Sequence, residues 1–214
     1  MRLKNVKGAN EIIIKGKYYI DNPEDNIGSW QKVFKNNNPI HIEIGMGKGD
    51  FIIENALTNP KINYIGIEKY DSVIVRAIQK SNELEIDNLK IIRTDALNID
   101  KIFNKEIEVI YLNFSDPWPK ERHAKRRLTS NVFLEKYDII FKNNPKIIMK
   151  TDNIDLFNYS IETLKEHNYN ITYITNDLHN EKNNDNNIMT EYEKRFVSRG
   201  IKINKLIAEK QTQN

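Results

Sequence analysis

Three glycines at alternate positions carry the strongest chemical signal in the sequence. They are Gly45, Gly47 and Gly49 in the run IEIGMGKGDF, between a predicted strand and a predicted helix. A loop of this kind lets the backbone approach a ligand closely at the carboxyl edge of a parallel sheet. The dinucleotide fingerprint needs its third glycine three residues after the second. That position holds Asp50, so the nicotinamide-binding pattern fails.

Three acids accompany this loop at the ends of successive predicted strands. Glu43 precedes the loop, Glu68 ends the second strand and Asp95 follows the third. Each acid alone is more typical of a solvated surface, but their recurrence beside the loop favours a shared site. The pattern G-x-G-x-G behind an acid resembles the loop of class I S-adenosylmethionine-dependent methyltransferases. Glu43 would then lie on the methionine side, Glu68 would accept both ribose hydroxyls and Asp95 would border the adenine.

A stiff segment, Phe114-Ser115-Asp116-Pro117-Trp118-Pro119, follows the fourth predicted strand. Its two prolines restrict the backbone, and it lies where the transferable methyl group should be. A planar base could be held there by Trp118 and met by the Asp116 carboxylate. Class I methyltransferases that act on nitrogen have a similar motif at this place. The alternative is a rigid structural turn with a packed tryptophan.

A basic run follows directly, although the net charge of the chain is only +3. It contains five permanent cations: Lys120, Arg122, Lys125, Arg126 and Arg127. Such a run beside a presumed active site is typical of phosphate binding, whereas most charge runs are solvated faces. Five phosphate contacts would give a slope of log K against log salt of about −3.5 to −4.5. Thr129 is expected to cap the next helix.

Two later segments are ambiguous. Asp152, in KTDN at the end of the fifth strand, could reach the same pocket, but Asp152 or Asn153 could equally be a helix N-cap. The segment Thr190-Glu191-Tyr192-Glu193 has the spacing of a capping box, and the spacing alone favours that interpretation over a binding site.

Alternation of strand and helix patterns predicts an α/β fold with a mainly parallel twisted sheet and helices on both faces. We expect strands at 40–44, 64–68, 90–93, 109–113, 146–150, 170–174 and 196–207, the last broken at Arg199-Gly200, with an antiparallel pair at the C-terminal end. We expect helices at 50–57 and 71–81, the second capped by Asp71, and two more around 133–141 and 154–164. The stretch 176–187 is a predicted loop. Residues 1–30 are a predicted basic arm on a single domain at 31–214.

Composition excludes several classes of function. The 214 residues include no Cys, which excludes disulfides, thiolate metal sites and cysteine nucleophiles. The four histidines show no ligand spacing, so no metal is expected. No apolar stretch approaches the roughly 18 residues of a membrane span, and the first residues lack a signal-peptide core. We therefore expect a soluble, cytoplasmic protein.

Taken in order, the segments HIEIGMGKGDF, YIGIEKY, YLNFSDPWPKERHAKRRL, KTDN and IMTEYEKRF resemble the tRNA (guanine-N7-)-methyltransferase family over residues 20–200. The resemblance implies a class I methyltransferase Rossmann-like fold and a cytoplasmic enzyme. Its methyl donor would be S-adenosyl-L-methionine, leaving S-adenosyl-L-homocysteine, and no metal is implied. The substrate would be N7 of the guanine at position 46 in the tRNA variable loop. A monomer and a homodimer both stay open.

The resemblance also assigns roles. The cofactor contacts would be Glu43, Gly45, Gly47, Gly49, Glu68, Asp95 and Asp116, and Asp116 would also be catalytic. The substrate and RNA contacts would be Lys120, Arg122, Lys125, Arg126, Arg127, Asp152, Thr190, Glu191, Tyr192 and Glu193. For the last four residues the family pattern overrules the capping-box preference, although one residue can serve both roles. Our hypothesis is that Asp116 or Glu193 accepts hydrogen bonds from the N1–H and N2–H edge of guanine.

Three other functions stay possible from the residues alone. A methyltransferase for a protein or small-molecule nitrogen would share the glycine loop without needing the basic run. A non-catalytic RNA-binding module would need the basic run but none of the three acids. A nicotinamide oxidoreductase is the weakest alternative, because of Asp50.

Overall fold

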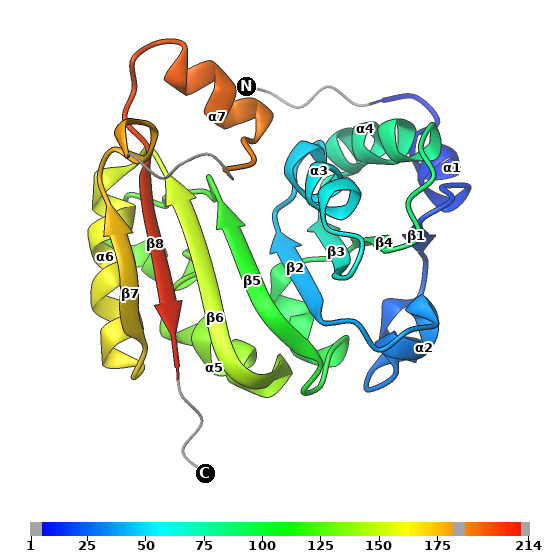
Figure 1. Ribbon diagram of the computed structural model, residues 1–214, viewed down its shortest axis with the longest axis horizontal. Coiled ribbons are helices and arrows are strands. Elements are labelled where there is room, and N and C mark those ends of the chain that lie inside the picture. Colours follow the sequence, from blue (N-terminus) through cyan, green and yellow to red (C-terminus); the bar gives the residue numbers. More distant parts are fainter. Residues whose placement is uncertain (1–5, 182–186, 211–214) are drawn as a thin grey trace.

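The apolar runs of the sequence form one eight-stranded sheet in the computed structural model, which describes residues 6–181 and 187–210 (Figure 1). The strands are β1 (Tyr19–Ile20), β2 (Ile40–Ile44), β3 (Asn63–Glu68), β4 (Leu89–Arg93), β5 (Ile107–Asn113), β6 (Phe141–Thr151), β7 (Asn170–Thr175) and β8 (Asn204–Glu209). Their order is β1-β4-β3-β2-β5-β6-β8-β7. Strand β8 pairs antiparallel with β6 and β7, and the pairs among β1–β6 are parallel. The predicted mainly parallel sheet with an antiparallel C-terminal pair is confirmed.

Helices cover both faces of the sheet. They are α1 (Ala9–Ile14), α2 (Trp30–Phe34), α3 (Asp50–Thr58), α4 (Asp71–Asn82), α5 (Asn131–Ile140), α6 (Ile154–Glu166) and α7 (Glu191–Val197). Short 3-10 turns are η1 (Pro23–Asn26), η2 (Ala96–Lys101), η3 (Glu121–Arg126) and η4 (Leu178–Asn180). Helices α3 and α4 lie in front of β2–β4 in Figure 1, whereas α5 and α6 lie behind the sheet. Helix α7 lies over the carboxyl ends of β5 and β6.

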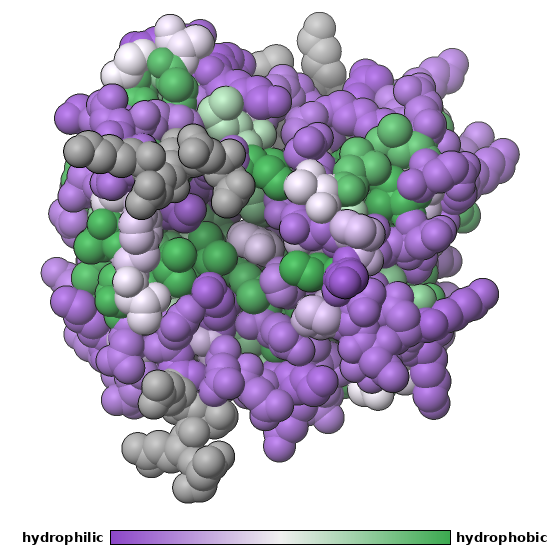
Figure 2. Space-filling model, viewed as in Figure 1, coloured by the Kyte–Doolittle hydropathy of each residue, from purple (hydrophilic) through white to green (hydrophobic). Residues whose placement is uncertain are grey.

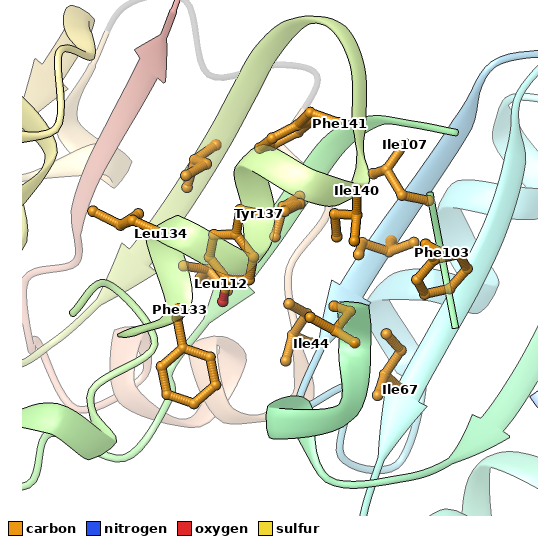
Figure 3. Packing of buried hydrophobic residues seen from close by; sticks show 14 of the residues in the cluster. Ile44, Ile67, Phe103, Ile107, Leu112, Phe133, Leu134, Tyr137, Ile140 and Phe141 are labelled. Carbon is orange, nitrogen blue, oxygen red and sulfur yellow. The ribbon is translucent and has the colours of Figure 1, made fainter. Parts of the chain in front are cut away.

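Two apolar cores lie on opposite faces of the sheet. Alternate residues of β2, Ile40, Ile42 and Ile44, belong to the larger core with α5 and α6. Figure 3 shows Tyr137 and Ile140 of α5 among the side chains of β5 in this core. The smaller core lies under α1, α3 and α4. Because strand side chains alternate, Glu43 of β2 points away from the larger core, toward the face that α3 covers.

The two halves of the sheet differ in how their front face is covered. Figure 2 shows hydrophilic side chains over most of this view, one apolar patch over β6–β8 and a second near α4. In Figure 1 no helix lies in front of those strands below α7. The half-buried Ile148 and Ile207, paired across β6 and β8, belong to this region. Helical cover of the front face is therefore concentrated on the half that carries the glycine loop.

The structure corrects three local predictions. The predicted strand at 196–207 is wrong in its first half, because the capping box at Thr190 begins α7, which runs to Val197, and β8 begins only at Asn204. Thr129 does not cap α5: Ser130 is the N-cap, and Thr129 Oγ1 lies 2.7 Å from Ser160 Oγ. The N-cap of α4 is Tyr70, and Asp71 is its first helical residue.

The first segment of the chain joins the sheet. Strand β1 pairs in parallel with β4, with Tyr19 opposite Ile91, and α1 packs on α4. The division into an arm at 1–30 and a domain at 31–214 stays a prediction. Of the predicted loop at 176–187, residues 182–186 lie outside the described residues. Within the described ranges, no helix has the length and apolar character to cross a membrane.

Candidate active site

The glycine loop between β2 and α3 leaves open space above its backbone. Gly45 and Gly47 have φ of 77° and 59°, a region that L side chains rarely adopt, and a Cβ at either would meet no described atom within 4 Å. A Cβ at Gly49 would instead come within 2.8 Å of the Ala77 Cβ in α4. The first two glycines therefore leave room for a ligand, and the third lets α3 start against α4.

Glu68 ties the end of β3 to this loop. Its Oε1 accepts hydrogen bonds from the backbone N–H groups of Lys69 (2.8 Å) and Tyr70 (3.0 Å), and its Oε2 accepts from Gly47 (3.2 Å). Burial raises the pKa of Glu68, and the three backbone N–H groups oppose this shift. The carboxylate thus stands at the loop with backbone donors already holding its orientation.

Asp95 stands next to Glu68 on the same edge of the sheet. It is the N-cap of η2 and accepts a hydrogen bond from Leu97 N at 3.0 Å. The Lys69 ammonium lies 3.5 Å from its Oδ2. Lys69 directly follows Glu68, and Thr94 N donates to Glu68 O at 3.2 Å, so the neighbouring ends of β3 and β4 bring the two acids near each other. Asp95 is partly exposed and open to a ligand.

Glu43 lies beneath the glycine loop rather than on its open side. The residue is 1% exposed, and its Oε1 accepts a hydrogen bond from Asn113 Nδ2 at 2.8 Å. Its Oε2 has no hydrogen-bond partner among the described residues. Burial raises the pKa of Glu43 to about 8, opposed by the Asn113 hydrogen bond and the Lys150 charge. A cationic group near Oε2 would satisfy this buried oxygen.

The segment after β5, residues 113–119, is strained. Phe114 and Trp118 have φ of 52° and 41°, which is unusual for residues with a Cβ and is typical of functional sites. Phe114 N donates to Lys150 O at 2.8 Å, so the start of the loop lies beside the carboxyl end of β6. The Asp116 side chain is exposed, and it forms no ion pair or hydrogen bond with any residue the structure describes. We call residues 113–119 the Asp116 loop.

Arg127 binds the backbone of the Asp116 loop. Its Nε donates to Pro117 O at 3.2 Å and its Nη2 donates to Trp118 O at 3.2 Å. The guanidinium lies 4.2 Å from the centre of the Tyr159 ring, and Arg127 is only 8% exposed. The guanidinium donors therefore bind carbonyl groups of the protein and do not face solvent, where a phosphate could reach them.

The other four cations of the basic run are exposed. Lys120, Arg122 and Lys125 form no ion pair within the described ranges. The Arg126 guanidinium lies 4.8 Å from the centre of the Trp118 ring, which the His123 ring meets edge-on at 5.8 Å. The run thus divides into exposed cations on η3 and one buried arginine under the Asp116 loop.

A buried ion pair joins β6 to α7. Lys150 Nζ lies 2.6 Å from Glu193 Oε2, with side-chain exposures of 2% and 0%. The ammonium also donates to Ile188 O at 2.8 Å. Glu193 Oε1 accepts from Asn187 Nδ2 at 2.9 Å and lies 3.0 Å from His179 Nε2. Burial lowers the pKa of Lys150, and Glu193 opposes that shift. Both charges are compensated, so the pair fixes α7 over the sheet.

The start of α7 meets both loops of the site. Thr190 Oγ1 accepts from Glu193 N at 2.9 Å, and Thr190 N donates to Glu193 Oε2 at 3.4 Å, which confirms the capping box. Glu191 pairs with Lys48 of the glycine loop at 2.7 Å. The Tyr192 ring lies 5.1 Å from the Phe114 ring. Helix α7 therefore bridges the glycine loop and the Asp116 loop.

Asp152 is half-buried and lies near Tyr192. Burial is the first cause that raises the pKa of Tyr192, and the Asp152 charge is the second. The N-cap of α6 is Asn153, whose Oδ1 accepts from Leu156 N at 2.8 Å, so Asp152 is left for another role. This outcome resolves the N-cap ambiguity in KTDN in favour of Asn153.

Sequence reasoning missed the residues that connect these parts. Asn113 binds Glu43, and Lys150 and His179 bind Glu193. One signal was present, because Lys150 is a lysine at the end of an otherwise apolar strand. Its partner, however, is 43 residues away along the chain, and no local pattern identifies it. In the ranges that the structure describes, no three His, Cys, Asp or Glu side chains are grouped to hold a metal ion.

The architecture is shared with methyltransferases of known structure. The structure matches an antibiotic-related methyltransferase with a TM-score of 0.66 at 17% identity, covering 92% of this chain and 98% of that one. It matches a 16S rRNA (adenine(1408)-N(1))-methyltransferase from Catenulisporales acidiphilia with a TM-score of 0.64 at 9% identity, covering 89% and 94%. At these identities the matches show the fold alone. Fold and glycine loop together define a class I methyltransferase.

Sequence comparison shows to which methyltransferase family the chain belongs. A family model described as "Putative methyltransferase" matches residues 37–206. A tRNA (guanine-N(7)-)-methyltransferase from Lachnoclostridium phytofermentans is 53% identical over 209 residues, covering 97% of this chain and 98% of the relative. One from Bacillus cytotoxicus is 47% identical over 215 residues, covering 100% and 99%. The chain belongs to the tRNA (guanine-N7-)-methyltransferase family.

Proposed function

We propose that this protein transfers a methyl group from S-adenosyl-L-methionine to N7 of the guanine at position 46 of tRNA, giving 7-methylguanosine. One observation carries the proposal: α7 brings the glycine loop and the Asp116 loop together, through Lys48–Glu191 and Phe114–Tyr192. A ligand on the glycine loop and a base at Asp116 would therefore be neighbours. The reaction takes place in the cytoplasm, where tRNA is modified in bacteria.

The residues at the glycine loop fit this cofactor. Gly45, Gly47 and Gly49 would let the backbone approach it. Glu68 would accept from the ribose hydroxyls through Oε2, which has one backbone donor, whereas Oε1 already accepts from two. Asp95 would border the adenine, and the unpartnered Glu43 Oε2 suits a nearby ammonium. When bound, the cofactor supplies an electrophilic methyl group on a sulfonium sulfur, and S-adenosyl-L-homocysteine remains after transfer.

Asp116 is better placed than Glu193 to select guanine. Both oxygens of Glu193 already have partners, and the side chain is inaccessible. Asp116 is exposed, and no described residue pairs with it. Its carboxylate would accept from the N1–H and N2–H groups of guanine, whereas adenine lacks this donor pair. We therefore assign base selection to Asp116 and give Glu193 the task of holding α7.

Catalysis follows from positioning. Guanine N7 carries an in-plane lone pair, so the protein needs no general base to prepare the nucleophile. Asp116 would hold the base in line with the methyl group, and its carboxylate favours the positive charge that develops on the ring. The Arg126 guanidinium lies over one face of the Trp118 indole, so a base would stack on the other face. Asp152 and Tyr192, beside the same loop, would contact the substrate.

The exposed part of the basic run provides a binding surface for the tRNA backbone. Lys120, Arg122, Lys125 and Arg126 lie directly after the Asp116 loop. Their exposed charges suit phosphates, and their position would hold the variable loop beside the site. The target base must leave its tertiary contacts to react, and phosphate binding offsets part of that cost.

The test is methyl transfer from labelled S-adenosylmethionine to two tRNA transcripts, with guanine or adenine at position 46. The product is then cleaved at 7-methylguanosine to locate the mark. We expect label only in the guanine transcript, at that position. Equal labelling of both transcripts would refute the site, and no labelling despite calorimetric cofactor binding would refute tRNA guanine as the substrate.

A further inference from the structure

A second group of exposed cations lies on α7 and the turn that follows it. Lys194 and Arg195 belong to the helix, and Arg199 lies in the turn that Gly200 ends. All three are exposed, and none of them forms an ion pair within the described ranges. Lys202, by contrast, is paired with Asp177 at 3.1 Å. We call Lys194, Arg195 and Arg199 the α7 cations.

The acids of the same helix do not neutralise this group. Glu191 is paired with Lys48 at 2.7 Å, and Glu193 is paired with Lys150 at 2.6 Å and is buried. Each acidic charge is therefore already balanced by a cation from another element. The α7 cations add three uncompensated positive charges to the surface of α7, which attracts anions.

One of the α7 cations, Arg195, lies near the Asp116 loop. The Arg195 guanidinium is 5.9 Å from the centre of the Tyr192 ring, which packs against Phe114 of that loop. Tyr192 also stacks on Phe196 at 4.2 Å, so the aromatic side of α7 borders the loop. Arg195 is therefore on the side of α7 that a base at Asp116 would approach.

The basic run meets the same loop from its other end. Arg126 lies over Trp118, whereas Arg195 of α7 is connected to the loop through Tyr192 and Phe114. Phe114 and Trp118 bracket Asp116 along the chain, and both have positive φ. The loop thus stands between two separate groups of cations. A single strand of RNA that presents a base to Asp116 has phosphates on both sides of that base.

We propose that the α7 cations bind backbone phosphates of the tRNA on the side of the target guanine opposite to the basic run. This inference rests on the proposed function, since it takes tRNA as the substrate. Phosphate contacts on both sides of the extruded base would fix the RNA backbone at both sides of the base. Contacts on one side alone would leave the backbone on the other side unrestrained. The basic run alone would then account for only part of the salt dependence.

The experiment measures tRNA affinity as a function of salt for the triple variant Lys194→Gln/Arg195→Gln/Arg199→Gln. Each lost phosphate contact should reduce the slope of log K against log salt by about 0.7 to 0.9, so three should reduce it by roughly 2 to 2.7. At about 0.1 M salt the affinity should fall roughly five- to eightfold per contact. The control is Lys61→Gln/Lys105→Gln/Lys142→Gln, which removes the same charge at the amino ends of β3, β5 and β6.

The outcomes separate this inference from the proposed function. Wild-type labelling of the guanine transcript is measured first and decides the function by itself. With that activity present, we expect a reduced slope in the triple variant, an unchanged slope in the control and an unchanged calorimetric affinity for S-adenosylmethionine. Arg195→Lys/Arg199→Lys, which keeps the charge, should retain the wild-type slope. Equal slopes for the triple variant, the control and the wild type would overturn the inference.

Discussion

The two sides of the candidate active site are held in different ways. On the cofactor side, backbone N–H groups of the glycine loop donate to Ile67 O and to the Glu68 carboxylate at the end of the neighbouring strand β3. On the substrate side, the Asp116 loop has two strained residues and depends on side chains from distant elements, including Arg127 and Tyr192. The cofactor side is thus set by the sheet itself, whereas the substrate side depends on how α7 and η3 dock.

This difference has a functional meaning. A cofactor shared by many methyltransferases can be bound by a preformed backbone loop. Selection of one base in one RNA needs side chains whose positions the family can vary, and such residues are found on loops held by a rigid scaffold. We therefore expect substitutions on the substrate side to change turnover or RNA binding while cofactor binding is kept.

The largest effect on activity should come from Asp116→Ala. Loss of the carboxylate that we propose holds guanine and favours the developing charge should lower kcat/KM by about 100- to 1000-fold. Single-turnover methylation of the guanine transcript measures this change, and tRNA affinity and its salt slope should stay at the wild-type value. Activity within threefold of wild type would show that Asp116 has no role in the reaction, and it would contradict the account of the substrate side.

The largest effect on stability should come from Lys150→Met. It leaves Glu193 charged and buried without its cation, which costs about 3 to 5 kcal/mol. Urea unfolding measures the loss. The double variant Lys150→Met/Glu193→Gln removes both charges and should recover at least half of it. No recovery in the double variant would show that the two residues stabilise the protein independently.

A smaller effect is expected from Arg127→Lys. A lysine cannot reproduce the fork that reaches both Pro117 O and Trp118 O, so the Asp116 loop should lose its alignment. Turnover should fall roughly 10- to 100-fold while the salt slope of tRNA binding stays unchanged. Lys125→Gln is the matched control. It should keep the turnover of the wild type and lower the salt slope by about 0.7 to 0.9. A reduced slope in Arg127→Lys would identify Arg127 as a phosphate ligand instead.

The last effect concerns the pH dependence of stability, is confined to the cofactor side and involves Glu43. Its pKa of about 8 exceeds the ordinary value of 4.5, so between these pH values the folded protein binds a proton that the unfolded chain lacks. Stability contributed by this group therefore falls as pH rises from about 4.5 to 8. Glu43→Gln stays neutral, so its melting temperature relative to wild type should increase from pH 5 to pH 8. A pH-independent difference would show that Glu43 is ionised throughout.

Local patterns predicted most of the cofactor side. The glycine spacing, the strand at 40–44 and the acid at the end of β3 can all be recognised within short segments. Burial of Glu43 was beyond the sequence, because its partner Asn113 lies 70 residues further along the chain. The family resemblance added roles that the spacing could not.

The substrate side was less predictable for a physical reason. The capping box at Thr190 is local, and it was recognised. The continuation of α7 through Phe196 was missed, because an apolar alternation from Phe196 to Ile207 is compatible with a strand. Tertiary packing determines both the Lys150–Glu193 pair and the hydrogen bonds from Arg127 to two carbonyls. The sequence of the basic run therefore does not show which of its cations is buried.

The most direct test of this division is a calorimetric titration of S-adenosylmethionine into two variants, Glu68→Ala and Arg127→Lys. Glu68 accepts a hydrogen bond from the glycine loop and would face the ribose, whereas Arg127 holds the Asp116 loop. The account predicts that Glu68→Ala weakens cofactor binding at least tenfold and that Arg127→Lys keeps it within twofold of wild type despite reduced turnover. Equal weakening in both variants would contradict the separation of the two sides.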